Sequence, residues 1–260
     1  MIDTHCHLTF PEFSGQVESV LTAARAVGVR GVVTVATTTA NALECVALAD
    51  AQVGVFASAG VHPLYADSPR DWHEMHRAAL HPKCVAWGEL GLDRHYDKPP
   101  LEMQRKVLDE QLANIIRWTG EGLAKPVIVH CREAFADLIS ILASSGLPRE
   151  RFVFHCFTGT REDARAVLDF GASISFTGVV TYPSARELHE AARLVPIDRM
   201  MVETDAPFLA PQPVRGQWPN EPRHVVHVAQ ALAAIHGIDP QELERTLDSN
   251  AERFFGVRWE

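Results

Sequence analysis

The stretch Met1-Ile2-Asp3-Thr4-His5-Cys6-His7-Leu8 decides the fold. It is typical of a buried strand, in which side chains alternate between two faces, so His5 and His7 are predicted to point the same way and Cys6 the opposite way. Parallel barrels build their active sites at the carboxyl ends of their strands, and two neutral imidazoles at that end suit a borderline transition metal. An isolated His-x-His is about equally often a pair of structural histidines, so other segments must decide.

Four further segments share one pattern, in which an apolar run ends abruptly in a histidine or a carboxylate. Strands buried on both faces of a parallel sheet read as such runs. One polar residue at a strand end is more often structural than a ligand, but carboxylates and imidazoles from five strand ends are costly to gather unless a cation lies among them. The pattern therefore predicts a metal site. The segments are Ala86–Asp93, Val127–Arg132, Phe152–Gly159 and Met201–Pro207.

The length of 260 residues and the hydrophobic content of 47% match a single (β/α)₈ barrel, which has about 250 residues. We predict one α/β domain over residues 1–260, a TIM-type barrel with a C-terminal helical extension. The sequence has no long uncharged apolar stretch and no basic leader followed by an apolar region, which predicts a cytoplasmic protein without a membrane span. Its five cysteines include no Cys-x-x-Cys pair and are expected to be buried and reduced.

Apolar runs and amphipathic stretches alternate along the rest of the chain, as the crossovers between parallel strands require. The second, third and seventh strands are predicted at 32–35, 53–60 and 172–176. Helices are predicted at 16–27, 40–49, 103–118, 134–143 and 161–170. The C-terminal extension is predicted to contain a helix over 223–236 and a terminal helix opened by Asp239-Pro240.

Seven motifs occur in order over nearly the whole chain: Asp3–Leu8, Gly60–Pro63, Gly88–Asp93, His130–Ala134, His155–Gly159, Glu203–Pro211 and Asn250-Ala251. Together they resemble the TatD family of metal-dependent deoxyribonucleases. The resemblance implies a TIM-type barrel of the metal-dependent hydrolase superfamily and a nuclease activity on DNA. Carried over by motif, one metal would be held by His5, His7 and Asp205, a second by His130 and His155, and Glu89 would bridge them.

The chemistry of such a pair agrees with this resemblance. Two adjacent cations can share a hydroxide, neutralise a phosphoryl oxygen and stabilise a leaving alkoxide, as phosphodiester hydrolysis requires. We therefore predict two divalent ions, Mg²⁺, Mn²⁺ or Zn²⁺, as cofactors. Asp205 is the candidate general base and Glu89 the second catalytic carboxylate. His62 is interpreted either as a phosphate contact or as a loop-capping residue, and the role of Glu203 stays open.

The charge of the chain favours a small nucleic-acid contact. The net charge is -9 and Lys and Arg form no cluster, which disfavours a broad basic surface for duplex DNA. Two divalent ions would make the barrel mouth locally positive. The predicted substrate contacts are His62, Arg132, Arg215 and Glu221. We therefore predict exonucleolytic cleavage from a DNA end or single strand, without a membrane or an obligate protein partner.

One loop departs from the family pattern. Between Arg215-Gly216 and Asn220-Glu221-Pro222 the family usually carries a basic pair, whereas this chain has Gln217-Trp218-Pro219 and is one residue longer. The departure puts the phosphate contact of this loop in question.

Two alternative functions stay open. The first is an amide or ester hydrolase of the same superfamily, in which a carboxylated lysine often bridges two metals. Glu89 takes that sort of place here, and Lys125 precedes a strand at the wrong end of the barrel, which favours the phosphodiesterase; fold alone does not set the substrate. The second is a non-catalytic, metal-stabilised interaction module, which would require a defective site. All six predicted ligands are present, so we rank this alternative last.

Overall fold

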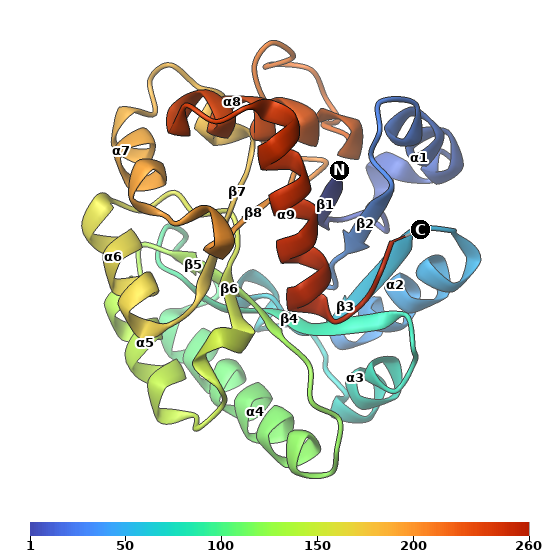
Figure 1. The fold of residues 1–260 in the computed structure, drawn as a ribbon. Helices are drawn as coiled ribbons and strands as arrows, with labels where there is room; N and C mark the ends of the chain where they lie inside the picture. Colours follow the sequence, from blue (N-terminus) through green and yellow to red (C-terminus); the bar gives the residue numbers. More distant parts are fainter. Residues whose placement is uncertain (260) are drawn as a thin grey trace.

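The computed structural model describes residues 1–259, and its eight strands form one parallel sheet in which each strand pairs with the next. The first and last strands also approach each other. The Asp205 N–H donates to the His5 carbonyl over 2.9 Å, and the His7 N–H donates to the Ala206 carbonyl over 2.7 Å. These bonds close the sheet, and the helices surround it (Figure 1). The predicted α/β TIM-type barrel is confirmed.

The strands are β1 (Ile2–Cys6), β2 (Gly31–Thr34), β3 (Val55–Ala59), β4 (Cys84–Asp93), β5 (Val127–Arg132), β6 (Phe152–Phe154), β7 (Ser173–Phe176) and β8 (Met200–Val202). The α-helices are α1 (Val17–Ala26), α2 (Thr39–Ala51), α3 (Trp72–Ala79), α4 (Leu101–Gly120), α5 (Phe135–Ser144), α6 (Arg161–Phe170), α7 (Arg186–Leu194), α8 (Val225–His236) and α9 (Pro240–Phe255). Most predicted elements overlap these. Helices α3 and α7 were not predicted, because each is short and buries only three residues.

The C-terminal extension fills one end of the barrel. Helix α9 crosses in front of the strands in Figure 1 and begins at a capped turn, where the Asp239 side chain accepts the N–H groups of Gln241 and Glu242. Its Phe255 packs in one apolar cluster with Ile2 of β1 and strand residues around the barrel. Burying a side chain such as Phe255 stabilises the fold by about 1.5–3 kcal/mol. Helix α9 therefore covers the amino end of the barrel, opposite the carboxyl ends of the strands.

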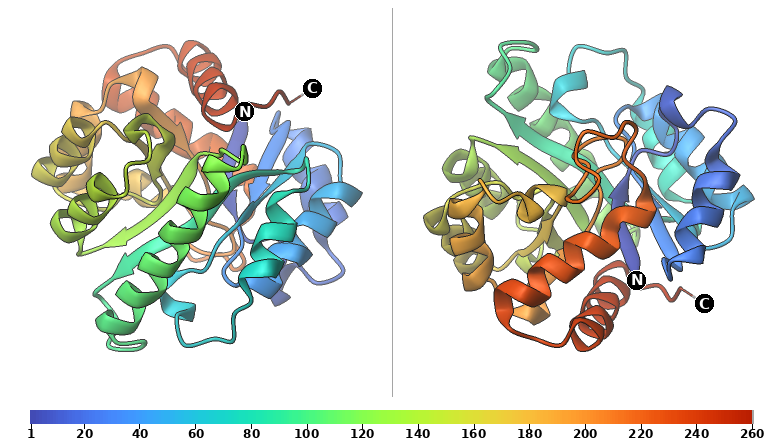
Figure 2. Two further views of the ribbon diagram at one scale, coloured as in Figure 1. Left: turned by 90° about the horizontal axis from the view of Figure 1, so that it is seen from below. Right: turned by 90° about the horizontal axis from the view of Figure 1, so that it is seen from above.

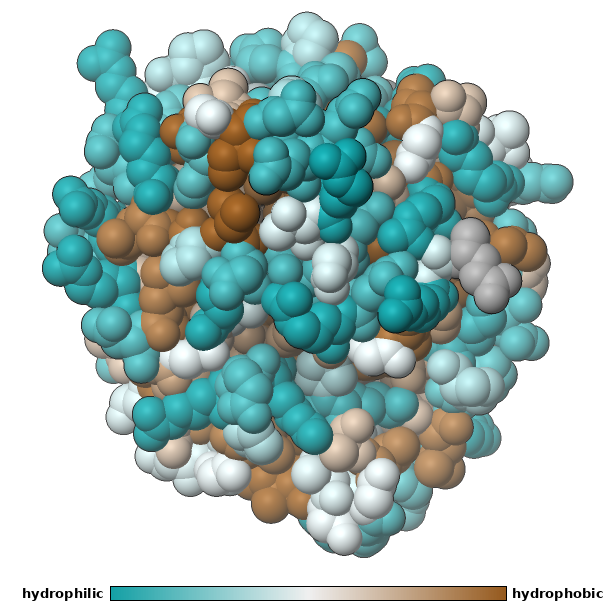
Figure 3. All heavy atoms as spheres, viewed as in Figure 1, coloured by the Kyte–Doolittle hydropathy of each residue, from teal (hydrophilic) through white to brown (hydrophobic). Residues whose placement is uncertain are grey.

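The surface in Figure 3 is mainly hydrophilic, and most of the cysteines lie in the core. On the face seen in Figure 3, hydrophilic residues predominate and hydrophobic ones lie between them in small groups. All five cysteines are free thiols, and four are buried as predicted, whereas Cys156 is partly exposed. Within residues 1–259, no helix has the length and apolar character needed to cross a bilayer.

The carboxyl end of the barrel is covered in part by the long segment between β8 and α8. Figure 2 shows this segment, in orange, beside the dark-blue strand β1. Asn220 within it is buried and ties it down, because its side chain donates to the carbonyls of Thr204 (3.1 Å) and Phe208 (2.6 Å). These bonds hold the later part of the segment against the turn that follows β8.

Candidate metal centre

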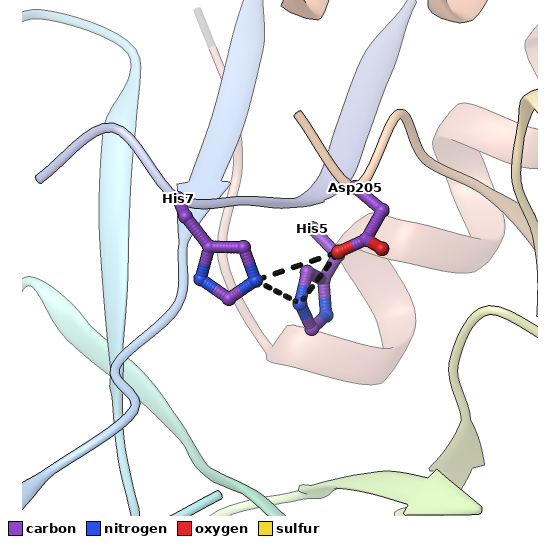
Figure 4. A group of neighbouring side chains, drawn as sticks. All are labelled: His5, His7 and Asp205. Carbon is purple, nitrogen blue, oxygen red and sulfur yellow. Dashed lines mark hydrogen bonds and ion pairs between the residues drawn. The ribbon is translucent and has the colours of Figure 1, made fainter. Parts of the chain in front are cut away.

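The side chains of His5, His7 and Asp205 converge where β1 meets the segment after β8 (Figure 4). His5 and His7 point their Nε2 atoms toward Asp205 (Figure 4), and these atoms lie 3.3 Å apart. Each lies 3.4–3.6 Å from Asp205 Oδ1. Glu89 Oε1, at a bulge of β4, lies 3.6 Å from His5 Nε2 and 3.5 Å from His7 Nε2. The predicted same-side arrangement of His5 and His7 is confirmed, although β1 itself ends at Cys6.

These four donor atoms have the spacing of a metal site. Donors at the corners of a tetrahedron around an ion at about 2.1 Å are about 3.4 Å from one another. The five separations that involve a histidine nitrogen are 3.3–3.6 Å. Two imidazoles and two carboxylates are also a suitable donor set for a divalent ion. The residues present therefore fit a metal ion.

A second group of donors meets the other oxygen of Glu89. Glu89 Oε2 lies 2.8 Å from His155 Nε2, which follows β6, and 3.5 Å from His130 Nδ1 on β5. The two ring nitrogens are 3.2 Å apart. The six predicted ligands are thus brought together, with the Glu89 carboxylate between two groups.

Hydrogen bonds set which nitrogen of two imidazoles is free to bind a metal. His7 Nδ1 lies 3.1 Å from the Val35 carbonyl, a pure acceptor, so Nδ1 carries the proton and Nε2 keeps its lone pair. His130 Nε2 lies 3.0 Å from Asp93 Oδ2, which frees Nδ1 in the same way. In both rings the free nitrogen is the one that faces Glu89, as metal-binding histidines require. His155 Nδ1 lies 3.3 Å from Glu203 Oε1 but makes no hydrogen bond to it.

His62 has the opposite arrangement. Its Nδ1 accepts the N–H of Leu64 over 3.0 Å, so in the neutral ring the proton lies on Nε2. Burial lowers the pKa of His62 to about 3, so the ring is neutral near pH 7. Nε2 lies 3.7 Å from Glu89 Oε2 and 3.1 Å from His130 Nδ1. His62 therefore presents a hydrogen-bond donor to the centre rather than a lone pair.

His5, like His155, has a buried ring nitrogen that makes no hydrogen bond within residues 1–259. Its Nε2 faces Asp205 and Glu89, whereas its Nδ1 is buried and has no hydrogen-bond partner in the described structure. The ring stacks on that of His155, with centroids 3.9 Å apart. Behind both rings lies Glu203, whose carboxylate accepts the Cys156 N–H over 2.6 Å. Glu203 thus lies beside the rings of His5 and His155, and donor atoms of these three residues all lie within 4.8 Å of one another.

The buried side chain of Asp3 connects the backbone of His5, the first predicted ligand in the sequence, to the residue before Asp205, the last one. Asp3 accepts the His5 N–H over 3.3 Å and, from the far end of the chain, the Thr204 N–H over 2.9 Å. It also accepts the Thr204 hydroxyl over 2.5 Å. Burial raises the pKa of Asp3 to about 8. Asp3 therefore fixes the β1 backbone against the turn that carries Asp205.

The buried carboxylates of the centre need compensating positive charge. Burial alone raises the pKa of Glu89, but the surrounding imidazoles hold it well below its usual range. Burial likewise opposes protonation of His155, yet Glu89 and Glu203 keep its pKa well above the ordinary value. In the absence of metal, protons on the imidazoles compensate the carboxylates. A divalent cation would replace those protons.

The centre opens into a cavity of about 540 Å³ at the carboxyl end of the barrel. Among residues 1–259, those lining it include His62 and Arg132 but neither Arg215 nor Glu221. The guanidinium of Arg215 lies 4.0 Å from the Tyr182 ring centroid, and Glu221 Oε2 lies 3.0 Å from Arg223 Nε. Of the predicted substrate contacts, His62 and Arg132 therefore line the cavity. Arg215 and Glu221 lie outside it and contact other protein side chains.

Sequence reasoning did not identify the residues that orient the ligands. Asp93 ends the Gly88–Asp93 motif and was given no role, although an acidic residue closing a strand beside a histidine-bearing strand is a usable signal. The Val35 carbonyl has no sequence signal, because every residue carries one. The aromatic residues Phe10, Tyr65, Tyr96 and Phe208, which also line the cavity, were not singled out either.

The comparison with protein families agrees with the site. A profile described as TatD related DNase matches residues 2–256. The chain belongs to the TatD family. It is 39% identical over 260 residues to the uncharacterized metal-dependent hydrolase YcfH of Escherichia coli strain K12, covering 99% of this chain and 96% of that one. It is 36% identical to a 3'-5' ssDNA/RNA exonuclease TatD of Pantoea vagans, covering 98% and 99% of the two chains. The crystal structure of YJJV, a TatD homolog of Escherichia coli, superposes with a TM-score of 0.91 at 32% identity, covering 99% and 98%.

Proposed function

We propose that this TatD-family protein is a metal-dependent nuclease that hydrolyses phosphodiester bonds of DNA from a strand end. The observation that carries the proposal is the pair of donor groups that share the Glu89 carboxylate, with its two oxygens 3.5 Å from His7 Nε2 and 2.8 Å from His155 Nε2. The naming of the Pantoea vagans relative as an ssDNA/RNA exonuclease supports a nucleic-acid substrate. A single hydrolase barrel over residues 1–260, acting in the cytoplasm, completes the proposal.

The proposed cofactors are two divalent ions, Mg²⁺, Mn²⁺ or Zn²⁺. His5, His7 and Asp205 would hold one, His130 and His155 the other, and Glu89 both. When bound, such ions polarise a phosphoryl oxygen and lower the pKa of water. The imidazoles of His7 and His130, whose outer nitrogens are hydrogen-bonded to Val35 O and Asp93, are held in the tautomer that this role requires.

Asp205 is the proposed general base. Its Oδ1 faces His5 and His7, and its second carboxylate oxygen is left to accept the proton of the attacking water. Its backbone N–H donates to the His5 carbonyl, which fixes the base against the strand that bears two ligands. Although burial raises the pKa of Asp205, in the metal-free protein the hydrogen bond from protonated His7 and the charges of nearby imidazoles keep it low, so the group is ionised near pH 7.

His62 and Arg132 are the proposed substrate contacts inside the cavity. The Nε2–H of His62 is placed to donate to a phosphoryl oxygen, because Nδ1 is already occupied by Leu64. Arg132 supplies a positive charge at the cavity wall, where its guanidinium lies 5.5 Å from the Tyr96 ring centroid. Arg215 and Glu221 are kept as contacts outside this wall.

The experiment that tests the function uses single-stranded DNA labelled at either end, with duplex DNA, RNA and matched amide and ester substrates beside it. Metal-stripped protein is assayed alone and with Mg²⁺, Mn²⁺ or Zn²⁺. We expect metal-dependent shortening of the single strand from one end. Amide hydrolysis without loss of any nucleic acid would favour the amidohydrolase, and bound metal without any turnover would favour the interaction module.

A further inference from the structure

A row of aromatic rings runs from the metal centre to the protein surface. The ring of His7 stacks on Phe10, with centroids 4.7 Å apart and planes 21° apart. Phe10 meets Phe208 edge to face at 6.0 Å, and Phe208 contacts Trp218 at 5.7 Å. Exposure rises along the row, since Phe208 is 40% exposed and Trp218 60%. The row begins at a predicted metal ligand and ends in a large apolar ring in solvent.

The position of Trp218 is fixed by the backbone around it. Two residues later, Asn220 is fully buried, its N–H donates to the Pro207 carbonyl over 2.8 Å, and its side chain holds the carbonyls of Thr204 and Phe208. The loop is therefore tied to the same short segment that carries Asp205. An exposed tryptophan beside Phe208, which lines the cavity of the predicted metal centre, is a candidate contact for a flat apolar ligand group.

The two arginines of this loop are already in contact with groups of the protein. The guanidinium of Arg215 lies over the Tyr182 ring, with 4.0 Å between them, and Arg223 pairs with Glu221 at 3.0 Å. The exposed ring of Trp218 adds an aromatic surface to the charges that this loop offers to a ligand.

We propose that Trp218, backed by Phe208, is the stacking platform for an unpaired nucleobase of the substrate strand, close to the phosphate that is cleaved. This inference rests on the proposed nuclease function. Nucleobases stack on aromatic side chains without strong sequence preference, because every base has an apolar face. A base in a duplex is already stacked and paired, so the platform selects single strands and frayed ends.

The test measures coupling between Trp218 and one base. A set of short single-stranded DNAs carries an abasic site at each of the positions nearest the cleaved end in turn, and kcat and KM are measured with Mn²⁺. In the wild type, one abasic position should lower kcat/KM by about 5- to 100-fold, mainly through KM. Trp218→Ala should cause a similar loss on the intact strand and no added loss at that position, whereas Trp218→Phe should restore most of the activity.

The control is Ile116→Ala, an exposed apolar residue on the outer helix α4, which should behave as the wild type. Penalties of Trp218→Ala and of the abasic site that simply multiply would overturn the stacking proposal, since they would assign Trp218 to loop packing or to a protein contact. That result would leave the nuclease function standing. Wild-type protein that cleaves no nucleic acid would instead overturn the proposed function, and this inference with it.

Discussion

Asp93 Oδ2 lies 3.0 Å from His130 Nε2, on the side of the ring that faces away from Glu89. Asp93 ends β4, and His130 lies two residues before the end of the neighbouring strand β5, whose register pairs Asp93 with Arg132. Asp93 also accepts the His95 N–H over 2.9 Å, so its carboxylate is itself held in place. The carboxylate therefore fixes both the orientation and the tautomer of a predicted ligand without touching the ion.

The first prediction concerns this pair. Asp93→Asn removes the charge that makes the His130 ring a stronger donor, so metal affinity should fall by about 10- to 100-fold while the barrel stays folded. Isothermal titration of the metal-stripped protein measures the change. Asp97→Asn, at an exposed position of the same loop, is the matched control. Unchanged affinity in Asp93→Asn would mean that His130 does not depend on this partner or does not bind metal.

The second prediction concerns Glu89 as the residue shared by both groups. Glu89→Gln loses a negative charge at the point between them, so the protein should lose one metal equivalent and most of its activity while keeping its circular dichroism spectrum. Elemental analysis of the purified variant counts the metal. Glu121→Gln, on the surface, serves as the comparison. Full metal content together with full activity would remove Glu89 from the mechanism.

The third prediction separates base from binding at Asp205. Asp205→Asn keeps an oxygen but loses basicity, so turnover should fall by about 10²- to 10⁴-fold, much more than affinity for single-stranded DNA. Single-turnover kinetics and fluorescence anisotropy measure the two quantities separately. A variant with weaker DNA binding but normal turnover at saturation would make Asp205 a substrate-positioning residue.

The fourth prediction uses the tautomer of His62. Because its Nδ1 is taken by the Leu64 N–H, the ring has a donor and no lone pair toward the centre, so His62→Ala should keep the metal content of the wild type and lose activity. Metal analysis and steady-state kinetics on one preparation give both answers. Loss of a metal equivalent in His62→Ala would show instead that His62 is a ligand.

The fifth prediction is a pH dependence of stability. The pKa of His155 in the folded, metal-free protein lies well above its ordinary value of 6.5, so its stabilisation is complete below about pH 6.5 and is lost as the pH rises through the folded-state pKa. The melting temperature in chelator should therefore fall between neutral and alkaline pH. Saturating metal should flatten that fall, because the cation replaces the protons.

The comparison of melting temperatures with and without metal includes an internal control. Asp3, whose pKa burial raises to about 8, contributes a loss of stability in the same direction whether metal is present or not. The difference between the two melting curves therefore isolates the imidazoles. Parallel curves with and without metal would contradict a metal centre at these residues.

How much the sequence could predict depends on the kind of interaction. Convergence of His5 and His7 followed from strand alternation alone, and the barrel from the order of apolar runs. The direction of the Glu203 side chain could not be predicted from strand alternation. Strand β8 ends at Val202 and Asp205 adopts a φ of 55°, so the alternation no longer applies to either residue. Short helices such as α3 were missed because eight residues give too little periodicity.

The contact of β1 with the segment after β8 gives the centre a role beyond chemistry. Asp3 and Thr204, which hold the two sides together, are 201 residues apart in the sequence. An ion shared by His5 and Asp205 would act as a removable cross-link that closes most of the chain into one loop, and links closing long loops restrict the unfolded chain most. The ligand set is complete only when the last strand has docked against the first. Metal uptake would thus report that the barrel has finished folding. Metal depletion would first weaken the contact between β1 and the segment after β8.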